Sequence, residues 1–277
     1  MPDVAAKLSI RGPLIYRQSV WTRGTHWLWA VSLFFLLLSG LQIFNAKPSL
    51  HIGQETGFEY DNAVLEIGAR QVGDTVQGYT RLFGAEFDTT GLLGVSDEDG
   101  RQVVRAFPAW VTIPSTRSLA TGRIVHFFFA WLLVGTLLVW LLASLLNRHL
   151  QDLMIGRADL AALPGDIANH ARLRFHHTRR YNVLQKLAYA GVLFVALPLM
   201  ILTGLTMSPN FNASAPWLLD LFGGRQTARS LHFAVMLALV GFFVVHMLMI
   251  LAAGPLNELR SILTGWYRVD PDAGGEN

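Results

Sequence analysis

The sequence predicts an all-α membrane protein, a four-helix transmembrane bundle with a long extracytoplasmic loop between the first two helices. Hydrophobic residues occupy 52% of the 277 positions, only 15% are charged, and the mean hydropathy is +0.38. A chain with this composition is too apolar for an ordinary soluble domain of this size. Four stretches also reach the roughly 20 mostly apolar residues that a spanning helix needs.

The predicted helices cover about residues 20–44, 122–147, 183–207 and 229–254. A basic segment precedes the first apolar run, as in a signal peptide, but no small-residue cleavage site follows, so we expect a retained helix. Residues 45–121 form a predicted extracytoplasmic loop or cap, and residues 147–183 form a predicted basic cytoplasmic loop. Together these segments make residues 1–277 a single membrane domain.

The distribution of positive charge predicts the orientation in the membrane. Basic residues gather before the first helix and between the second and third helices, whereas acidic residues outnumber basic ones in the long first loop. Positive charge near the membrane marks the cytoplasmic side, so both termini are expected in the cytoplasm. The basic residues are Lys7, Arg11, Arg17, Arg23, Arg148, Arg157, Arg172, Arg174, Arg179 and Arg180.

Within the long loop, an aromatic and aliphatic cluster is expected to contact the membrane interface or a partner. Its members are Phe107, Trp110 and Ile113.

Four of the nine histidines lie near the ends of predicted helices. His232 and His246 are fourteen residues apart, which on an α-helix is roughly 21 Å along the axis and about 40° short of four full turns. Because helix directions alternate, His26 lies at the depth of His246 on the cytoplasmic side. His126 lies at the depth of His232 on the opposite side. These matched depths predict two b-type haems, each with its iron held by one of the two histidine pairs.

A single histidine at a helix end is more often an interfacial residue bonded to a headgroup or a carbonyl. Two pairs matched in depth, which share one helix, favour cofactor ligation instead. The chain has no cysteine, so disulfides, iron–sulfur clusters, thiolate zinc sites and covalently attached haem are excluded. The other histidines are expected in solvated loops, and they are His51, His149, His170, His176 and His177.

Arginine precedes three of the four predicted ligands by three residues, at Arg23, Arg123 and Arg229. On a helix, a side chain at this spacing lies on the same face, one turn nearer water. Haem propionates would point there, and we predict that these arginines bind them. The alternative is that the arginines set topology or contact lipid headgroups.

Glycines also occur within the predicted helices. They would admit a flat macrocycle or, equally, make the close helix contacts that membrane bundles favour. They are Gly40, Gly135, Gly191, Gly204 and Gly241.

Four segments together resemble the di-haem cytochrome b subunits of respiratory Ni/Fe-hydrogenases and formate dehydrogenases, in the bacterial cytochrome b561-like superfamily. They are RGTHWLWA at 23–30, GRIVHFFFAW at 122–131, RRYNVLQKLAY at 179–189 and the span from His232 to His246. The resemblance covers the four helices and not the long loop. It implies a multi-pass protein of the bacterial inner membrane. Such a subunit carries electrons between the quinone pool and a periplasmic catalytic partner of the molybdoenzyme or hydrogenase type.

The resemblance also implies a quinone site near the cytoplasmic haem, at the Tyr-Asn-x-x-Gln-Lys motif that opens the third helix. Tyr181, Asn182, Gln185 and Lys186 match this motif, while Leu184 stands where relatives often have glycine. An amide at the membrane edge can hydrogen-bond a quinone carbonyl. The alternative is that Asn182 caps the helix and the basic residues only fix topology.

Several functions remain open on the sequence alone. The favoured one is an electron-transfer subunit, because the large first loop suggests a docked protein partner. A similar protein working alone would oxidise superoxide and reduce quinone, with arginines attracting the anion. A transporter that uses histidines as a proton relay and a membrane anchor with unligated histidines are further alternatives. Nothing indicates nucleic-acid binding, and the direction of electron flow stays open.

Overall fold

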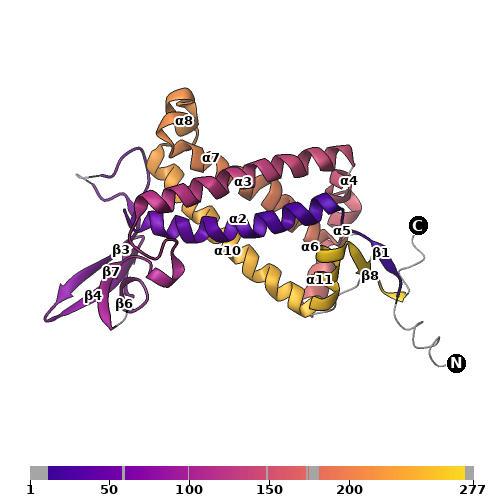
Figure 1. Ribbon diagram of the computed structural model, residues 1–277, viewed down its shortest axis with the longest axis horizontal. Coiled ribbons are helices and arrows are strands. Elements are labelled where there is room, and N and C mark those ends of the chain that lie inside the picture. The colour runs from indigo at the N-terminus through magenta and orange to yellow at the C-terminus, as the bar shows by residue number, and fades with distance from the viewer. Residues whose placement is uncertain are drawn as a thin grey trace. The chain divides into compact units, whose positions relative to one another are not determined.

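The computed structural model describes residues 12–57, 60–98, 100–147, 149–172, 174 and 181–271. Within these ranges four helical segments are long and apolar enough to cross a membrane (Figure 1). They are α2 (Val20–Phe44), α3 (Leu119–Leu146), the segment Val183–Thr206, and α10 (Arg225–Ala253). Several basic residues and histidines of the orientation and ligand predictions lie outside the described residues: Lys7, Arg11, Arg148, His176, His177, Arg179 and Arg180.

The third long segment changes its helical pitch midway. It runs through α6 (Val183–Gly191), the π-helical turn η2 (Val192–Ala196) and α7 (Leu197–Thr206). The Leu197 N–H donates to the Val192 carbonyl, five residues back. Pro198 follows directly and has no N–H to donate, so the widened turn stands where the regular hydrogen-bond pattern is interrupted.

The chain forms two compact units, and each contains part of every long helical segment. Residues 1–28, 136–197 and 238–277 form one, which we call the His26 unit. Residues 29–135 and 198–237 form the other, which we call the His126 unit. Each predicted histidine pair therefore falls within one unit.

The all-α prediction was wrong for the long first loop, which folds into antiparallel strands of the His126 unit (Figure 1). A four-stranded sheet has the order β2 (Ser49–His51), β3 (Ala63–Val72), β4 (Thr75–Leu82) and β5 (Ala85–Asp88). β6 (Gly94–Glu98) and β7 (Arg101–Arg105) form a separate hairpin.

Tight turns set the register of this sheet. Val72 pairs with Thr75, so only Gly73 and Asp74 connect β3 to β4. Gly73 has a φ of +57°, a conformation that glycine adopts without steric cost and that two-residue hairpin turns require. The Gly73-Asp74 turn is thus a strand signal that can be read from the sequence.

A small apolar core joins these strands to the long helices. The Phe44 ring at the end of α2 lies 5.5 Å from the Phe107 ring and 4.9 Å from the Phe233 ring of α10. Leu50 and Ile67 are buried in the same cluster. Phe107 therefore packs against the core, contrary to the prediction of an interfacial or partner-facing residue.

A buried arginine fixes the end of β7. The Arg105 side chain is 2% exposed, and its guanidinium donates to Gln42 Oε1 at 3.0 Å, Thr112 Oγ1 at 2.9 Å and the Ser115 carbonyl at 2.8 Å. Burial lowers the pKa of this guanidinium, while Glu98 opposes that shift. These bonds attach the strand region to the end of α2. Beyond Arg105 lies η1 (Ala109–Val111), and two short helices, α8 (Pro209–Ser214) and α9 (Trp217–Leu221), precede α10.

In the His26 unit, the segment predicted as a basic loop contains α4 (His149–Leu153) and α5 (Arg157–Ala171). The two ends of the described chain pair as strands β1 (Leu14–Tyr16) and β8 (Trp266–Arg268), after α11 (Pro255–Thr264). Gly265 has a φ of +89°, and a Cβ there would lie 2.4 Å from the Tyr16 ring, so this turn requires glycine.

Candidate functional site

The four predicted ligand histidines come together as two pairs. The rings of His126 (α3) and His232 (α10) have centroids 6.5 Å apart and an interplanar angle of 55°. The rings of His26 (α2) and His246 (α10) show the same 6.5 Å and 55°. Each pair joins two helices within its own unit.

This separation fits a metal ion held between two imidazoles. With a metal–nitrogen bond of about 2.0–2.1 Å and roughly 1.2 Å from nitrogen to ring centroid, the centroids would be about 6.4 Å apart. Among the described residues, no three His, Cys, Asp or Glu side chains gather as a metal site. Each pair therefore suits a metal whose remaining donors come with it, as the four nitrogens of a porphyrin do.

His126 is held by α2. Its Nδ1 lies 3.0 Å from Ser39 Oγ. A Cβ built on Gly40 would lie 3.4 Å from its Cε1. The imidazole thus contacts a hydroxyl and a glycine, where a side chain larger than alanine would press on the ring.

His232 is held in the same way by α7. Its Nδ1 lies 3.0 Å from Thr203 Oγ1, and a Cβ on Gly204 would lie 3.4 Å from its Cε1. Sequence reasoning missed both hydroxyls and left both glycines undecided. In each case the hydroxyl residue directly precedes the glycine within an apolar helix, but this dipeptide alone does not show that a histidine is its partner.

The second pair has different surroundings. His26 contacts the edge of Trp27, with centroids 5.6 Å apart, and its Nδ1 is buried without a hydrogen-bond partner among the described residues. His246 stacks on Phe242 with centroids 5.7 Å apart.

The three arginines near the ligands differ in what they contact. Arg229 donates to the Ser49 carbonyl at 2.7 Å and to the Lys47 carbonyl at 2.5 Å. Arg23 donates to the Leu263 carbonyl at 2.6 Å. The Arg123 side chain is exposed, with its guanidinium 5.6 Å from the Phe127 ring centre. Propionate binding by all three stays a prediction, and for two of them backbone carbonyls are the observed partners.

The motif at the start of α6 forms a capping box. Asn182 Oδ1 accepts from the Gln185 N–H at 2.8 Å, and Gln185 Oε1 accepts from the Asn182 N–H at 3.3 Å. Lys186 forms an ion pair with Asp159 at 3.0 Å. The two bonds between Asn182 and Gln185 are those expected of a helix cap. The quinone role of this motif remains a prediction.

A polar cluster surrounds Tyr181. Its hydroxyl accepts from Gln18 Nε2 at 3.0 Å, and the Arg17 guanidinium lies between the Tyr181 and Tyr267 rings, 4.6 Å and 4.5 Å from their centres. Gln18 Oε1 and Arg17 Nε are buried without partners in the described ranges. A cavity of about 210 Å³ borders Arg17, so unpaired polar atoms and space for a ligand occur in one region.

His51 corrects the expectation of solvated loop histidines. It lies in β2 and is 7% exposed, with its Nδ1 buried and unpartnered among the described residues. Its carbonyl accepts from Ser230 Oγ at 2.7 Å, two residues before His232. Of the others, His149 lies in α4 and His170 in α5.

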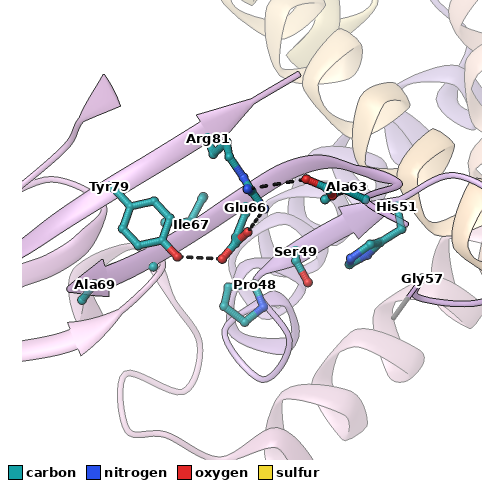
Figure 2. Close-up of a pocket in the computed structure, with 12 residues that line it drawn as sticks. Pro48, Ser49, His51, Gly57, Ala63, Glu66, Ile67, Ala69, Tyr79 and Arg81 are labelled. Atoms are coloured by element: carbon teal, nitrogen blue, oxygen red, sulfur yellow. Dashed lines mark hydrogen bonds and ion pairs between the residues drawn. The ribbon is translucent and has the colours of Figure 1, made fainter. Parts of the chain in front are cut away.

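His51 also lines a cavity of about 450 Å³ beside β2, β3 and β4. Figure 2 shows Glu66 in this cavity between Tyr79 and Arg81. Its carboxylate accepts from the Tyr79 hydroxyl at 2.6 Å and from Arg81 Nη2 at 2.5 Å. The cavity is therefore polar, and its charged side chains are held in place.

Residues 90–265 match the family described as prokaryotic cytochrome b561. The chain belongs to this family. Membership identifies a membrane protein that binds b-type haem. The matched segment contains His126, His232 and His246, whereas α2 with His26 precedes it.

A curated relative from Azospira oryzae is 24% identical over 232 residues, which cover 83% of this chain and 87% of the relative. Its name is "Putative protein-methionine-sulfoxide reductase subunit YedZ1". The similarity extends over most of the length of both proteins.

Proposed function

We propose that the protein is a membrane di-haem b-type cytochrome that carries electrons between a periplasmic oxidoreductase partner and the quinone pool. One observation carries the proposal: two histidine pairs with the same 6.5 Å centroid separation and 55° angle share α10. A b-type haem at each pair would supply a reversible one-electron change. The histidines would hold the iron of each haem.

The proposed location is the bacterial inner membrane, with both termini in the cytoplasm. The support is the positive charge before α2 and between α3 and α6. In this orientation the His126–His232 pair serves the periplasmic side and the His26–His246 pair serves the cytoplasmic side.

A quinone site is proposed at the polar cluster around Tyr181, in the same unit as the His26–His246 pair. The unpartnered Arg17 Nε–H would donate to a quinone carbonyl, and the unpartnered Gln18 Oε1 would accept from a hydroxyl of the quinol. The capping bonds use the oxygen atoms of the Asn182 and Gln185 side chains. Their NH₂ groups are therefore the atoms that would donate to a quinone carbonyl.

The periplasmic partner is proposed to be a catalytic oxidoreductase subunit of the molybdoenzyme or hydrogenase type. The name of the relative, a reductase subunit, supports a role within a complex. The polar cavity next to His51 and the exposed Trp110, which is 78% accessible, offer a contact surface on the same unit as the His126–His232 pair.

The test is a reduced-minus-oxidised spectrum with haem quantification on the purified full-length protein. We expect two haems in the wild type and about one in His126→Ala and in His246→Ala, because each variant removes one axial ligand. His170→Ala is the matched control and should keep two. A single haem in the wild type, or loss of both haems from each variant alone, would contradict the two-site assignment.

The exposed guanidinium of Arg123, three residues before His126, favours a second candidate, a stand-alone superoxide:quinone oxidoreductase. The purified chain, assayed with superoxide and quinone in the absence of any partner, distinguishes the two functions. Sustained quinone reduction would support the enzyme. A preparation without haem absorbance would instead point to a transporter or an anchor.

A further inference from the structure

The hydroxyls beside His126 and His232 are placed to accept hydrogen bonds from those rings. Ser39 Oγ donates its single proton to the Phe35 carbonyl at 2.6 Å. Thr203 Oγ1 donates its proton to the Leu199 carbonyl at 2.7 Å. Since a hydroxyl has one proton, an oxygen that donates to the helix carbonyl meets its histidine as an acceptor, and the ring Nδ1 then carries the proton. The Leu36 and Met200 carbonyls also accept from the His126 and His232 rings, which favours the same tautomer.

This arrangement fixes the tautomer of both rings. With the proton on Nδ1, the lone pair of each ring lies on Nε2, the nitrogen available to a metal. Ser39 and Thr203 are fully buried, so water does not compete for these bonds. An Nδ1–H that donates to a fixed acceptor makes the imidazole a more basic ligand.

The other pair lacks this support. His26 Nδ1 is buried with no partner, and no hydrogen bond to the His246 imidazole occurs among the described residues. The two histidine pairs thus have the same ring separation and angle but differ in the hydrogen-bond partners of their ring nitrogens.

We propose that Ser39 and Thr203 are positioning residues that lower the reduction potential of a haem at His126–His232 below that of a haem at His26–His246. A more basic axial ligand stabilises the oxidised iron, and second-shell hydrogen bonds are an established means of tuning potential. An electron passing from a haem at His126–His232 to a haem at His26–His246 would oxidise the first haem and reduce the second. The hydroxyls would thereby favour transfer toward the quinone side, which deepens the proposed function and depends on it.

The first test leaves Ser39 and Thr203 unchanged and uses the wild type and the two histidine variants. A potentiometric titration of the haem-loaded wild type should resolve two potentials, and His126→Ala and His246→Ala assign them, since each lacks one haem. The haem retained in His126→Ala should have the higher potential. The reverse order would overturn the inference.

The second test removes each hydroxyl. Thr203→Val keeps the side-chain shape, so water does not replace the lost acceptor, and Ser39→Ala is the counterpart on α2. We expect the potential of the His126–His232 haem alone to rise, by roughly tenfold in the one-electron equilibrium or about 59 mV for Thr203→Val. Thr203→Ser retains the acceptor and should restore the wild-type value.

Matched controls lie on the same two helices. Thr206 is buried and donates to the Thr203 carbonyl at 2.6 Å, and Ser32 is buried with a hydroxyl that makes no hydrogen bond among the described residues. Thr206→Val and Ser32→Ala should leave both potentials unchanged.

The outcomes separate the inference from the proposed function. Absence of haem from the wild type would refute the function itself. Two bound haems whose potentials do not move in Thr203→Val and Ser39→Ala would refute only the role of the hydroxyls. If both variants fail to retain haem, the order of the wild-type potentials and the behaviour of Thr203→Ser decide the question.

Discussion

Gly204 lies against the imidazole of His232, where a Cβ on the glycine would be 3.4 Å from Cε1 of the ring. This distance is ordinary contact for one methyl group and leaves no room for a branched side chain. Glycine at position 204 therefore leaves space for the His232 imidazole, in addition to any close helix contact.

The first prediction follows from this contact. Gly204→Ala should retain haem at His126–His232, whereas Gly204→Leu should displace the ring and lose that haem, leaving about one haem per chain by quantification. Gly241→Leu is the control, because nothing lies within 4 Å of a Cβ on this exposed glycine of α10. Equal haem content in the two leucine variants would show that Gly204 does not seat the ring.

The second prediction separates capping from quinone binding at Asn182. Asn182→Ala should lower stability by about 1 kcal/mol through loss of the N-cap. Asn182→Asp keeps a capping oxygen but lacks the NH₂ group, so thermal stability should stay near wild type while reoxidation of the reduced haem by quinone slows. If quinone reoxidises the reduced haem of Asn182→Asp at the wild-type rate, Asn182 acts only as the helix cap.

The third prediction concerns Arg123 and Arg229, the arginines that precede His126 and His232 by three residues. Arg229 holds two backbone carbonyls before and within β2, so Arg229→Gln should reduce stability by about 2 kcal/mol and lower the thermal midpoint. Arg123→Gln removes no such bond and should change haem affinity or potential with little effect on the midpoint. Unchanged haem binding and redox behaviour in both variants would remove the propionate assignment.

The fourth prediction tests the attachment of β7 to α2. Arg105→Met leaves the buried Gln42 and Thr112 oxygens without their donor, and we expect a loss of about 3 kcal/mol. Arg101→Met, on the exposed end of the same strand, should cost little. Thermal unfolding of the two variants in detergent makes the comparison, and similar midpoints would argue against a structural role for the buried guanidinium.

The fifth prediction is a pH dependence set by His51. Burial lowers the pKa of its imidazole, Lys47 and Arg229 add to the shift, and Asp61 and Glu66 oppose it. Folding therefore favours the neutral ring, and this stabilisation is present above the ordinary pKa of about 6.5 and lost as the pH falls. The thermal midpoint of the wild type should decline between pH 7.5 and 5 more steeply than that of His51→Gln. Parallel curves would contradict this.

The strands of residues 45–121 show where sequence reasoning fell short. Hydropathy identifies long apolar helices well, because about 20 apolar residues are needed for a span. Strands are shorter and half-exposed, so their signal lies in turns such as Gly73-Asp74 and in alternation. Both were present in the sequence, but neither says which apolar side chains complete a core, as Phe107 does with Phe44.

The sequence by itself determined the membrane class and which histidines would pair, because helical periodicity and depth in a bilayer depend only on position along the chain. Only the tertiary structure decided which groups contact the Nδ1 atom of each histidine ring. Ser39 reaches His126 across 87 residues, and Thr203 reaches His232 from another helix. A buried hydroxyl has no local pattern that distinguishes a histidine partner from a helix carbonyl, so its role depends on how helices distant in sequence pack together.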